Sequence, residues 1–319
     1  MVGSDHFDDG SVTAVATIRP ILVVAHTGRT ASLEAALDAC RQLTAAGAVP
    51  VLPGDQWDDL HEFAPELDGQ TQRLGVGVQP DDLELVVVLG GDGTILRAAE
   101  LVRNAATPIL GVNLGHVGFL AESERDDLGE AIARGLARDY VVEERMTLSV
   151  RVKQGEQIIH EDWALNEATV EKASRERMLE VAIEVDRRPL STFGCDGVVL
   201  STPTGSTAYA FSGGGPVVWP TLDAMLMVPL SAHALFARPI VVGPDSALAV
   251  ELLRRTAGAG VLWCDGRRSF DLPPGARVVV RRSSVPVRLA RLHPGPFTDR
   301  LVNKFQLPVS GWRGPETRD

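Results

Sequence analysis

The chain has 319 residues, of which 45% are hydrophobic and 23% charged, and its formal net charge is -11. These values are typical of a globular protein that can bury a sizeable core, and the length suits two domains. Nucleic acids and anionic membrane surfaces need basic partners, so the acidic balance counts against both as main partners. It remains compatible with a small anionic ligand held by local backbone N–H groups.

The start of the chain and its cysteines indicate a cellular compartment. Residues 1–17 contain neither a basic segment nor an apolar run, which predicts a disordered tail and no targeting signal. No apolar run approaches the length of a bilayer span. Cys40, Cys195 and Cys264 are far apart and form no C-x-x-C pair. We therefore expect a cytoplasmic protein with reduced thiols and no membrane partner.

Strands and helices alternate in the first half of the chain. Short runs rich in β-branched residues predict buried strands at residues 21–25, 49–52, 85–89 and 108–113. The spacing of apolar residues predicts helices at residues 33–43, after residue 94, and at 126–138. Residues 53–82 are rich in Asp, Gly and Pro and predict no clear element. This β-α-β order predicts a doubly wound α/β domain with a mostly parallel sheet.

The pattern changes to apolar and polar alternation after about residue 140. The alternating runs lie at residues 148–152, 181–185, 277–281 and 286–290. Turn-forming residues such as Pro273-Pro274-Gly275 separate them. This pattern predicts an all-β domain of packed antiparallel sheets, with one helix at 205–212. A last helix at 297–305 ends the fold.

The first candidate site is the turn Gly90-Gly91-Asp92-Gly93-Thr94, between a predicted strand and a predicted helix. Glycines let the backbone approach a phosphate oxygen, and the first N–H groups of a helix attract anions. A carboxylate repels phosphate, so Asp92 fits a group that takes a proton from an attacking hydroxyl, or that helps to hold Mg²⁺. A plain helix N-cap is the alternative. The turn has neither the P-loop spacing nor the G-x-G-x-x-G pattern.

Residues 196–216 form a second candidate, in which a strand leads into a turn and a short helix. The segment carries the hydroxyl side chains of Ser201, Thr202, Thr204, Ser206, Thr207, Tyr209 and Ser212. Hydroxyls and helix N–H groups suit a ribose and phosphate ligand, and Tyr209 adds a flat apolar face. A Ser/Thr-rich turn with Tyr209 and Phe211 in the core is the alternative.

The stretch from Asn113 to Leu120 is a third candidate. It follows a predicted parallel strand, and open α/β sheets bind ligands at such strand ends. Phe119 can contact an adenine or nicotinamide ring there, or it can be a core residue of a Gly-rich loop. His116 has no identifiable partner and fits a loop histidine without a catalytic role.

Asn166 and Glu167 are the fourth candidate, because they interrupt a strand-like apolar stretch. An amide beside a carboxylate can hold the two hydroxyls of a ribose. A solvated strand end is the alternative. The run Asp265-Gly266-Arg267-Arg268 fits a hairpin turn first, although it can approach a ligand. Zinc-binding and Ser-nucleophile motifs are absent from the sequence.

Taken together, these segments resemble the NAD kinase family. The matching pieces are GGDGT at 90–94, NLGHVGFLAE at 113–122, NE at 166–167 and DGVVLSTPTGSTAYAFSGGGP at 196–216. They occur in the family's order and cover most of the chain from about residue 20 to 310. GGDGT is shared with diacylglycerol and sphingosine kinases, whereas the long segment is much more specific to NAD kinases. The ending TDRLVNKFQLPVSGWRG looks like that of actinobacterial members.

The resemblance implies a site between two domains. Asp92 would activate the 2′-hydroxyl of the NAD adenosine ribose, and Gly91, Gly93 and Thr94 would hold the phosphates of the donor. The residues implied to line the NAD site are Phe119, Asn166, Glu167, Asp196, Thr204, Thr207, Ala208, Tyr209 and Ser212. Many members carry a basic or polar residue where this chain has Gly194, which leaves the preference between NAD and NADH open.

The same resemblance implies the domain bounds and the partners. The α/β domain would comprise residues 18–142 and the returning last helix at about 297–319, and the β-sandwich-like domain residues 143–296. The donor would be ATP or inorganic polyphosphate with Mg²⁺ or another divalent cation, and the active form a homodimer or homotetramer. Two alternatives remain: a lipid kinase that shares the GGDGT turn, and a non-catalytic sensor of NAD(H) or ATP.

Overall fold

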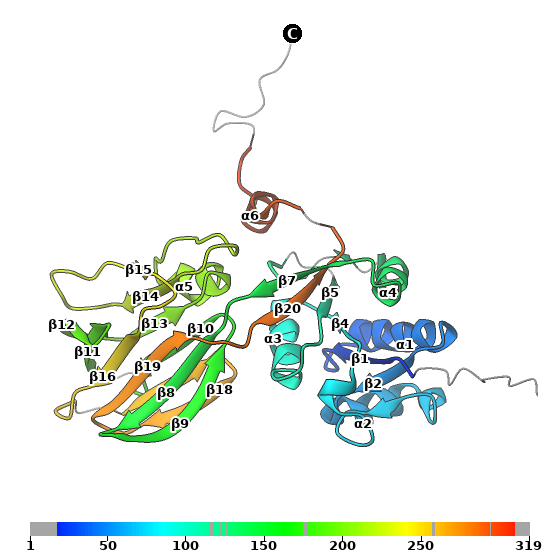
Figure 1. Cartoon of the computed structure of the whole chain (residues 1–319), viewed down its shortest axis with the longest axis horizontal. Helices are drawn as coiled ribbons and strands as arrows, with labels where there is room; N and C mark the ends of the chain where they lie inside the picture. The colour runs from blue at the N-terminus through cyan, green and yellow to red at the C-terminus, as the bar shows by residue number, and fades with distance from the viewer. Residues whose placement is uncertain are drawn as a thin grey trace, which may run out of the picture.

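The computed structural model describes residues 18–114, 118–121, 123–124, 127–174, 178–256, 259–293 and 295–309. The predicted tail at 1–17 and His116 lie outside these residues. The chain forms an α/β domain and an all-β domain that lie side by side (Figure 1). Within the described residues, no helix has the length and apolar character needed to cross a bilayer.

The α/β domain is built on an eight-stranded sheet with the order β3-β2-β1-β4-β5-β20-β7, and β6 pairs with β5. Its strands are β1 (Pro20–Ala25), β2 (Val49–Leu52), β3 (Gln72–Arg73), β4 (Leu85–Leu89), β5 (Ile109–Asn113), β6 (Ser123–Glu124), β7 (Val141–Arg145) and β20 (Val287–Arg291). All pairs are parallel except β7 with β20. The predicted doubly wound sheet is thus confirmed.

Helices cover both faces of this sheet. They are α1 (Thr30–Ala45), α2 (Gly54–Phe63), α3 (Asp92–Leu101) and α4 (Leu128–Leu136). In β1, Ile21 and Val23 pack in the core that contains α1 and α4, whereas Leu22 and Val24 pack in the core that contains α3. A strand that is buried on both faces reads as a continuous apolar run, which is why the sequence predicted these strands well.

The region at 53–82, for which the sequence predicted no element, contains α2, two short 3₁₀ helices (Pro65–Leu67 and Pro80–Asp82) and β3. Only Gln56 and Leu60 of α2 are buried. So few buried positions leave almost no apolar period for sequence reasoning to detect.

The all-β domain consists of two six-stranded antiparallel sheets with the orders β15-β14-β13-β10-β17-β18 and β12-β11-β16-β19-β8-β9. The strands are β8 (Leu148–Gln154), β9 (Gln157–Ala164), β10 (Glu167–Lys172), β11 (Leu179–Val185), β12 (Arg188–Cys195), β13 (Gly197–Ser201), β14 (Met225–Leu230), β15 (Ile240–Val242), β16 (Leu248–Leu252), β17 (Gly260–Cys264), β18 (Arg268–Leu272) and β19 (Ala276–Arg282). One apolar core joins the two sheets, so the domain is a β-sandwich, as predicted.

The strand expected at 286–290 in the β-sandwich lies elsewhere. It forms β20, which pairs with β5 and β7 in the sheet of the α/β domain. Four of its five residues are buried and only Arg288 is half-buried, but the sequence pattern alone fits either sheet, so only the tertiary pairing decides its place. The chain therefore crosses between the domains before β8 and again after β19.

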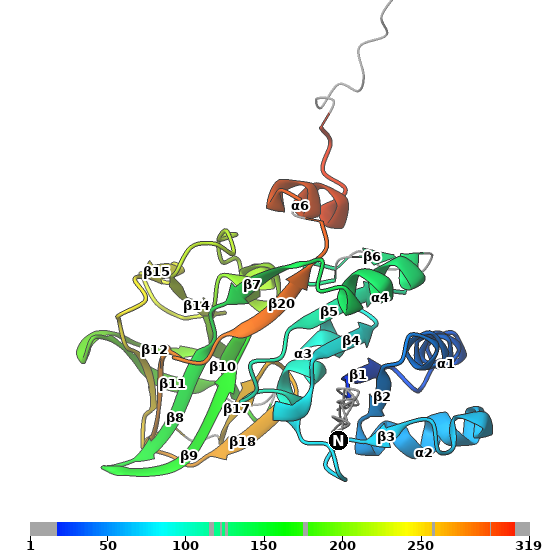
Figure 2. The same cartoon turned by 45° about the vertical axis from the view of Figure 1, so that its right-hand side comes forward.

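The last helix, α6 (Phe297–Phe305), lies over the junction of the two domains (Figures 1 and 2). Phe297 and Phe305 contact the ring of Phe119 from the α/β domain. They also contact Trp219 and Phe211, respectively, from the β-sandwich. The helix expected to return to the first domain thus touches both, and none of its residues is buried.

Candidate active site between the two domains

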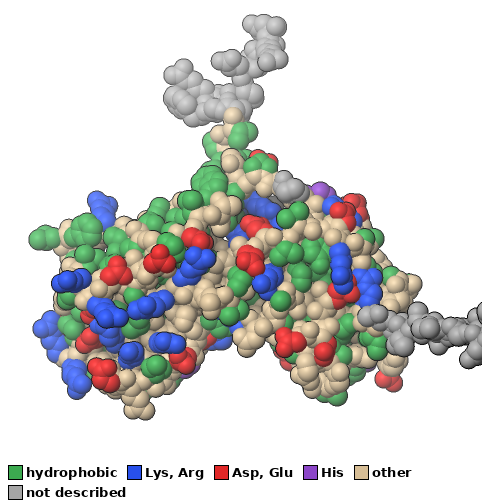
Figure 3. All heavy atoms as spheres, in the orientation of Figure 1, with side chains coloured by type: hydrophobic (Ala, Val, Ile, Leu, Met, Phe, Trp, Pro, Cys, Tyr) green, Lys and Arg blue, Asp and Glu red, His purple; other side chains and the backbone are tan. Residues whose placement is uncertain are grey.

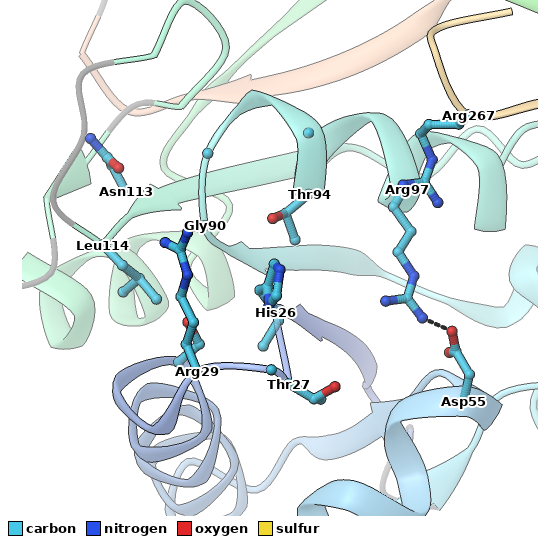
Figure 4. Close-up of a pocket in the computed structure, with 15 residues that line it drawn as sticks. His26, Thr27, Arg29, Asp55, Gly90, Thr94, Arg97, Asn113, Leu114 and Arg267 are labelled. Carbon is cyan, nitrogen blue, oxygen red and sulfur yellow. Dashed lines mark ion pairs between the residues drawn. The ribbon is translucent and has the colours of Figure 1, made fainter. Parts of the chain in front are cut away.

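A cavity of about 680 Å³ lies at the carboxyl ends of β1, β4 and β5. The chain leaves β1 toward β2 on one side of the sheet, and leaves β4 toward β5 on the other. Loops diverge where the strand order reverses, and they leave a crevice that binds ligands in open α/β sheets. Figure 4 shows the cavity between the β1–α1 loop and the Gly-rich turn.

The Gly-rich turn presents bare backbone to this cavity. Gly90, Gly91, Gly93 and Thr94 line it, and a Cβ added at Gly91 or Gly93 would meet no protein atom within 4 Å. The protein itself therefore leaves room at these two positions. Such room would let a ligand oxygen approach the backbone N–H groups at the start of α3, and phosphate binding there stays a prediction.

Three arginines give the cavity a positive lining. They are Arg29 after β1, Arg97 on α3 and Arg267 from the β-sandwich. Arg97 forms an ion pair with Asp55 of α2, and burial followed by the nearby Arg267 lowers the pKa of its guanidinium. Sequence reasoning missed Arg29 and Arg97 because they come from distant segments and belong to no motif, and it read Arg267 first as part of a hairpin turn that can approach a ligand. Guanidinium groups and backbone N–H groups together suit a chain of phosphates.

Asp92 is the first residue of α3, beside the cavity. Its carboxylate accepts the N–H of Phe119 at 3.1 Å and the N–H of Leu120 at 3.0 Å. A negative charge at a helix N-terminus is also favoured by the helix dipole. Asp92 is therefore held in one orientation by the backbone of residues 118–120.

Glu167 is the first residue of β10 and Asn166 comes just before it, and the two are only 7% and 8% exposed. Three consecutive backbone N–H groups, those of Leu165, Asn166 and Glu167, donate to the carboxylate of Asp265 at 2.7–3.3 Å. The pair is thus not a solvated strand end. It is a buried corner whose backbone is fixed by the β17–β18 turn.

Glu167 has an unusual electrostatic setting. Burial, and next the charge of Asp265, raise the pKa of Glu167 to about 8, although the backbone N–H of Tyr209 opposes the shift. One carboxyl oxygen, Oε2, is buried and has no hydrogen-bond partner among the described residues. A neutral carboxyl can donate as well as accept a hydrogen bond, so this group suits a ligand hydroxyl.

The hydroxyl-rich segment begins as a 3₁₀ helix (Thr204–Thr207), and after Ala208 it continues as α5 (Tyr209–Ser212). Thr204 is 8% exposed and its hydroxyl lies 3.5 Å from Arg145 Nη1, whereas Tyr209 is 40% exposed. Because the N–H of Thr202 donates to the carbonyl of Asn166 at 2.9 Å, the structure brings this segment and the Asn166-Glu167 pair together.

Asp196 and Phe119 lie in different surroundings from the other predicted residues. Asp196 is half-exposed and forms an ion pair of 2.5 Å with Lys172, which lowers the pKa of its carboxyl. Burial raises the pKa of the Tyr209 hydroxyl, and the charges of Glu171 and Asp196 add to this shift. The Phe119 ring is 7% exposed and packs against α6, so its observed contacts are those of a core residue.

The two-domain fold, with an arginine-lined cavity next to an acid, fits a phosphotransferase. The family models of the ATP-NAD kinase N-terminal and C-terminal domains match residues 21–140 and 165–292. The chain is 72% identical over 305 residues to an NAD kinase of Leifsonia xyli, across 96% of this chain and 100% of the relative. It is 58% identical over 300 residues to NAD kinase 2 of Streptomyces coelicolor, across 93% and 97%.

Solved structures show the same fold. Yeast NADH kinase complexed with NADH matches with a TM-score of 0.82 at 20% identity, over 92% of this chain and 89% of the other. An Archaeoglobus fulgidus NAD kinase in complex with ATP matches with a TM-score of 0.65 at 24% identity, over 91% and 98%. The chain belongs to the NAD kinase family, and its activity is the phosphorylation of NAD. This assignment replaces the two alternatives, a lipid kinase and a non-catalytic sensor.

Proposed function

We propose that the enzyme transfers the terminal phosphoryl group of ATP to the 2′-hydroxyl of the adenosine ribose of NAD, and that Asp92 takes the proton of that hydroxyl. The position of Asp92 carries this proposal. It stands at the N-terminus of α3, next to the glycines that line the arginine-lined cavity, with its carboxylate oriented by two backbone N–H groups. A group placed in this way can orient a hydroxyl and accept its proton late in an in-line transfer.

The cavity is the proposed donor site. Gly91, Gly93 and Thr94 would bind donor phosphates through backbone N–H groups and a hydroxyl, and Arg29 and Arg97 would add charge. The Archaeoglobus relative was solved with ATP, which supports ATP as the donor. Inorganic polyphosphate offers the same chain of phosphates to the same groups, so we keep it as a second donor.

A divalent cation, Mg²⁺, is the proposed cofactor. Mg²⁺ typically keeps several waters and binds through substrate phosphates and one or two protein oxygens. The hydroxyl of Thr94 and the amide of Asn113 line the cavity and fit this mode. Among the described residues, no group of three or more His, Cys, Asp or Glu side chains is placed to hold a metal, so the phosphates would supply most ligands. When bound, the cation neutralises charge on the phosphates.

The acceptor NAD would bind on the β-sandwich side of Asp92. Asn166 and the neutral carboxyl of Glu167 would hold the ribose hydroxyls, and Phe119 would close this part of the site. The remaining predicted contacts are Asp196, Thr204, Thr207, Ala208, Tyr209 and Ser212. The yeast relative was solved with NADH, which supports a dinucleotide in this fold.

We also propose that the enzyme is a homodimer or homotetramer in the cytoplasm. Large apolar side chains are exposed around α5 and the segment after it, namely Phe211 (41%), Trp219 (44%) and Leu222 (56%). Such a group of side chains suits a second copy of the chain. The three cysteines are buried and free, as expected in a reducing compartment. Light scattering coupled to gel filtration tests the oligomer directly.

The site of phosphorylation gives the decisive test. Purified enzyme is incubated with Mg²⁺, ATP and either NAD, its 2′-deoxyadenosine analogue or its 3′-deoxyadenosine analogue. We expect product from NAD and from the 3′-deoxy analogue, and none from the 2′-deoxy analogue. Phosphorylation of the 2′-deoxy analogue would refute the proposed acceptor hydroxyl. Replacing ATP by polyphosphate in the same assay tests the second donor.

A further inference from the structure

Helix α3 joins the proposed catalytic acid to the β-sandwich. Asp92 is its first residue, and Glu100 lies eight residues later, about 12 Å along the helix axis. The carboxylate of Glu100 accepts hydrogen bonds from two arginines of the β-sandwich. Arg267 Nε donates to Oε1 at 3.0 Å, and Arg268 Nη1 donates to the same oxygen.

The hairpin turn that carries these arginines also holds the proposed ribose-binding corner. Asp265 has a side chain that is 1% exposed, and it accepts the backbone N–H groups of residues 165–167. Its own N–H donates to the carbonyl of Glu167 at 2.9 Å. Arg268 links Glu100 of α3 to Asp265 of the turn, because its Nη1 donates to Glu100 and its Nη2 lies 3.4 Å from Asp265 Oδ2.

The same arginine is itself firmly placed. Arg268 Nε donates to Asp162 Oδ1 at 2.9 Å, and its guanidinium lies 4.9 Å from the ring centroid of Trp163. Arg103, just after α3, lies on the Trp163 ring at 4.0 Å. The C-terminal end of α3 therefore docks on the β-sandwich through charged groups that are partly buried, where ion pairs are screened less by salt.

We infer that Glu100 and Arg268 are positioning residues that set Asp92 relative to Asn166 and Glu167 by fixing α3 to the β17–β18 turn. This inference rests on the proposed roles of Asp92, Asn166 and Glu167. Neither Glu100 nor Arg268 lines the cavity, so both act through other residues. Because a shift of about 1 Å in a reacting group can cost about 10²-fold in rate, a loose link lowers turnover even when both substrates still bind.

The first test is Glu100→Gln, which keeps the shape of the side chain and removes its charge. We expect kcat per folded active site to fall about tenfold or more, with the KM for NAD and for ATP changed by less than about threefold. The kcat of Glu100→Asp, which keeps the charge, should lie between the kcat of the wild type and that of Glu100→Gln. Glu161→Gln is the matched control, since it breaks the 2.7 Å pair of Glu161 with Arg151 within the β-sandwich alone. A kcat near that of the wild type in folded Glu100→Gln would overturn the inference.

A second readout is independent of activity. Spin labels on Glu62→Cys and Glu156→Cys, two exposed positions in different domains, report the distance between the domains. The native thiols are buried, and burial raises the pKa of Cys40 and Cys195 to about 12, so they react slowly. We expect a narrow distance distribution that broadens or shifts in Glu100→Gln and Glu100→Asp but not in Glu161→Gln. Distance distributions that stay unchanged in both Glu100 variants would overturn the inference. Because this readout measures only the placement of the domains, it does not depend on the proposed roles of Asp92 and Glu167. Dilution with unlabelled enzyme isolates distances within one chain.

Discussion

Gly118 leaves the space that the carboxylate of Asp92 occupies, because a Cβ at position 118 would lie 2.5 Å from Asp92 Oδ1. The next two residues, Phe119 and Leu120, donate their N–H groups to the same carboxylate. The glycine thus allows the loop to approach the acid closely. The loop is a support for the acid as well as a candidate ligand contact.

The first prediction follows from this contact. Gly118→Ala should displace the Asp92 carboxylate and lower kcat by about 10²-fold, since misplacement of a reacting group by about 1 Å has this effect. The KM for ATP should change little, because the cavity does not include residue 118. Steady-state kinetics measure both quantities. Gly129→Ala on α4 is the control, because its Cβ would meet only a flexible side chain, that of Gln42, at 3.4 Å.

The second prediction concerns Asp92, the proposed proton acceptor. Asp92→Asn should lower kcat by about 10²- to 10⁴-fold, the usual contribution of a general base, while NAD still binds. The amide oxygen can still accept the N–H groups of Phe119 and Leu120, so the loop should keep its place. Titration calorimetry measures NAD binding, and NADP formation measures turnover. Exposed Asp81→Asn serves as the control, and near-normal turnover of Asp92→Asn would exclude the proposed role.

Much of the α/β domain could be predicted because its strands are buried on both faces. Leu85–Leu89 is fully apolar and runs into the Gly-rich turn, so strand, turn and helix could be identified without a structure. The case of β20 is different, since its short sequence pattern does not show which sheet the strand joins. The structure places it in the α/β sheet.

The candidate site likewise contains residues that the sequence could predict and residues that it could not. Asp92 and Asn166-Glu167 lie in short motifs whose residue types are unusual for their local structure. Arg267 was read first as part of a hairpin turn that can approach a ligand, and Glu100 was not singled out. Their roles depend on a contact between residues 167 positions apart, which spacing along the chain cannot reveal. The buried state of Glu167 is likewise a tertiary property.

The third prediction is a pH dependence from Glu167. The pKa of this carboxyl rises from 4.5 to about 8 in the folded protein, so the folded state holds a proton that the unfolded state releases between these values. The contribution of this group to stability therefore falls as pH rises from about 4.5 to about 8. Glu167→Gln, which cannot ionise, should flatten this decline. Thermal melts of both proteins at pH 6, 7, 8 and 9 (values set about one unit apart across the shifted pKa) measure it. Parallel curves would contradict the raised pKa.

The same substitution should also affect NAD binding. Near neutral pH the neutral carboxyl and the amide of Gln can both donate and accept hydrogen bonds, so the KM for NAD should rise only a few-fold. Above pH 8 the wild-type carboxylate would accept stronger charge-assisted bonds from ribose hydroxyls, and the gap between the two enzymes should widen. A ratio of KM values that stays constant across this range would argue against contact between Glu167 and the ribose.

The last prediction concerns the contact between the hydroxyl-rich segment and the proposed ribose-binding corner. A Cβ at Gly205 would overlap the backbone oxygen of Asn166, an oxygen that also accepts the Thr202 N–H at 2.9 Å. The Asn166 oxygen belongs to the backbone and cannot swing aside like the end of a flexible side chain. Gly205→Ala must therefore separate the 3₁₀ helix from the backbone at the start of β10. We expect a loss of about 3 kcal/mol in the free energy of unfolding, at the upper end of overpacking effects. Gly243→Ala, whose Cβ would meet no atom within 4 Å, should be close to neutral. Urea denaturation compares the two variants, and equal stabilities would show that the segment and the corner are not held together as described.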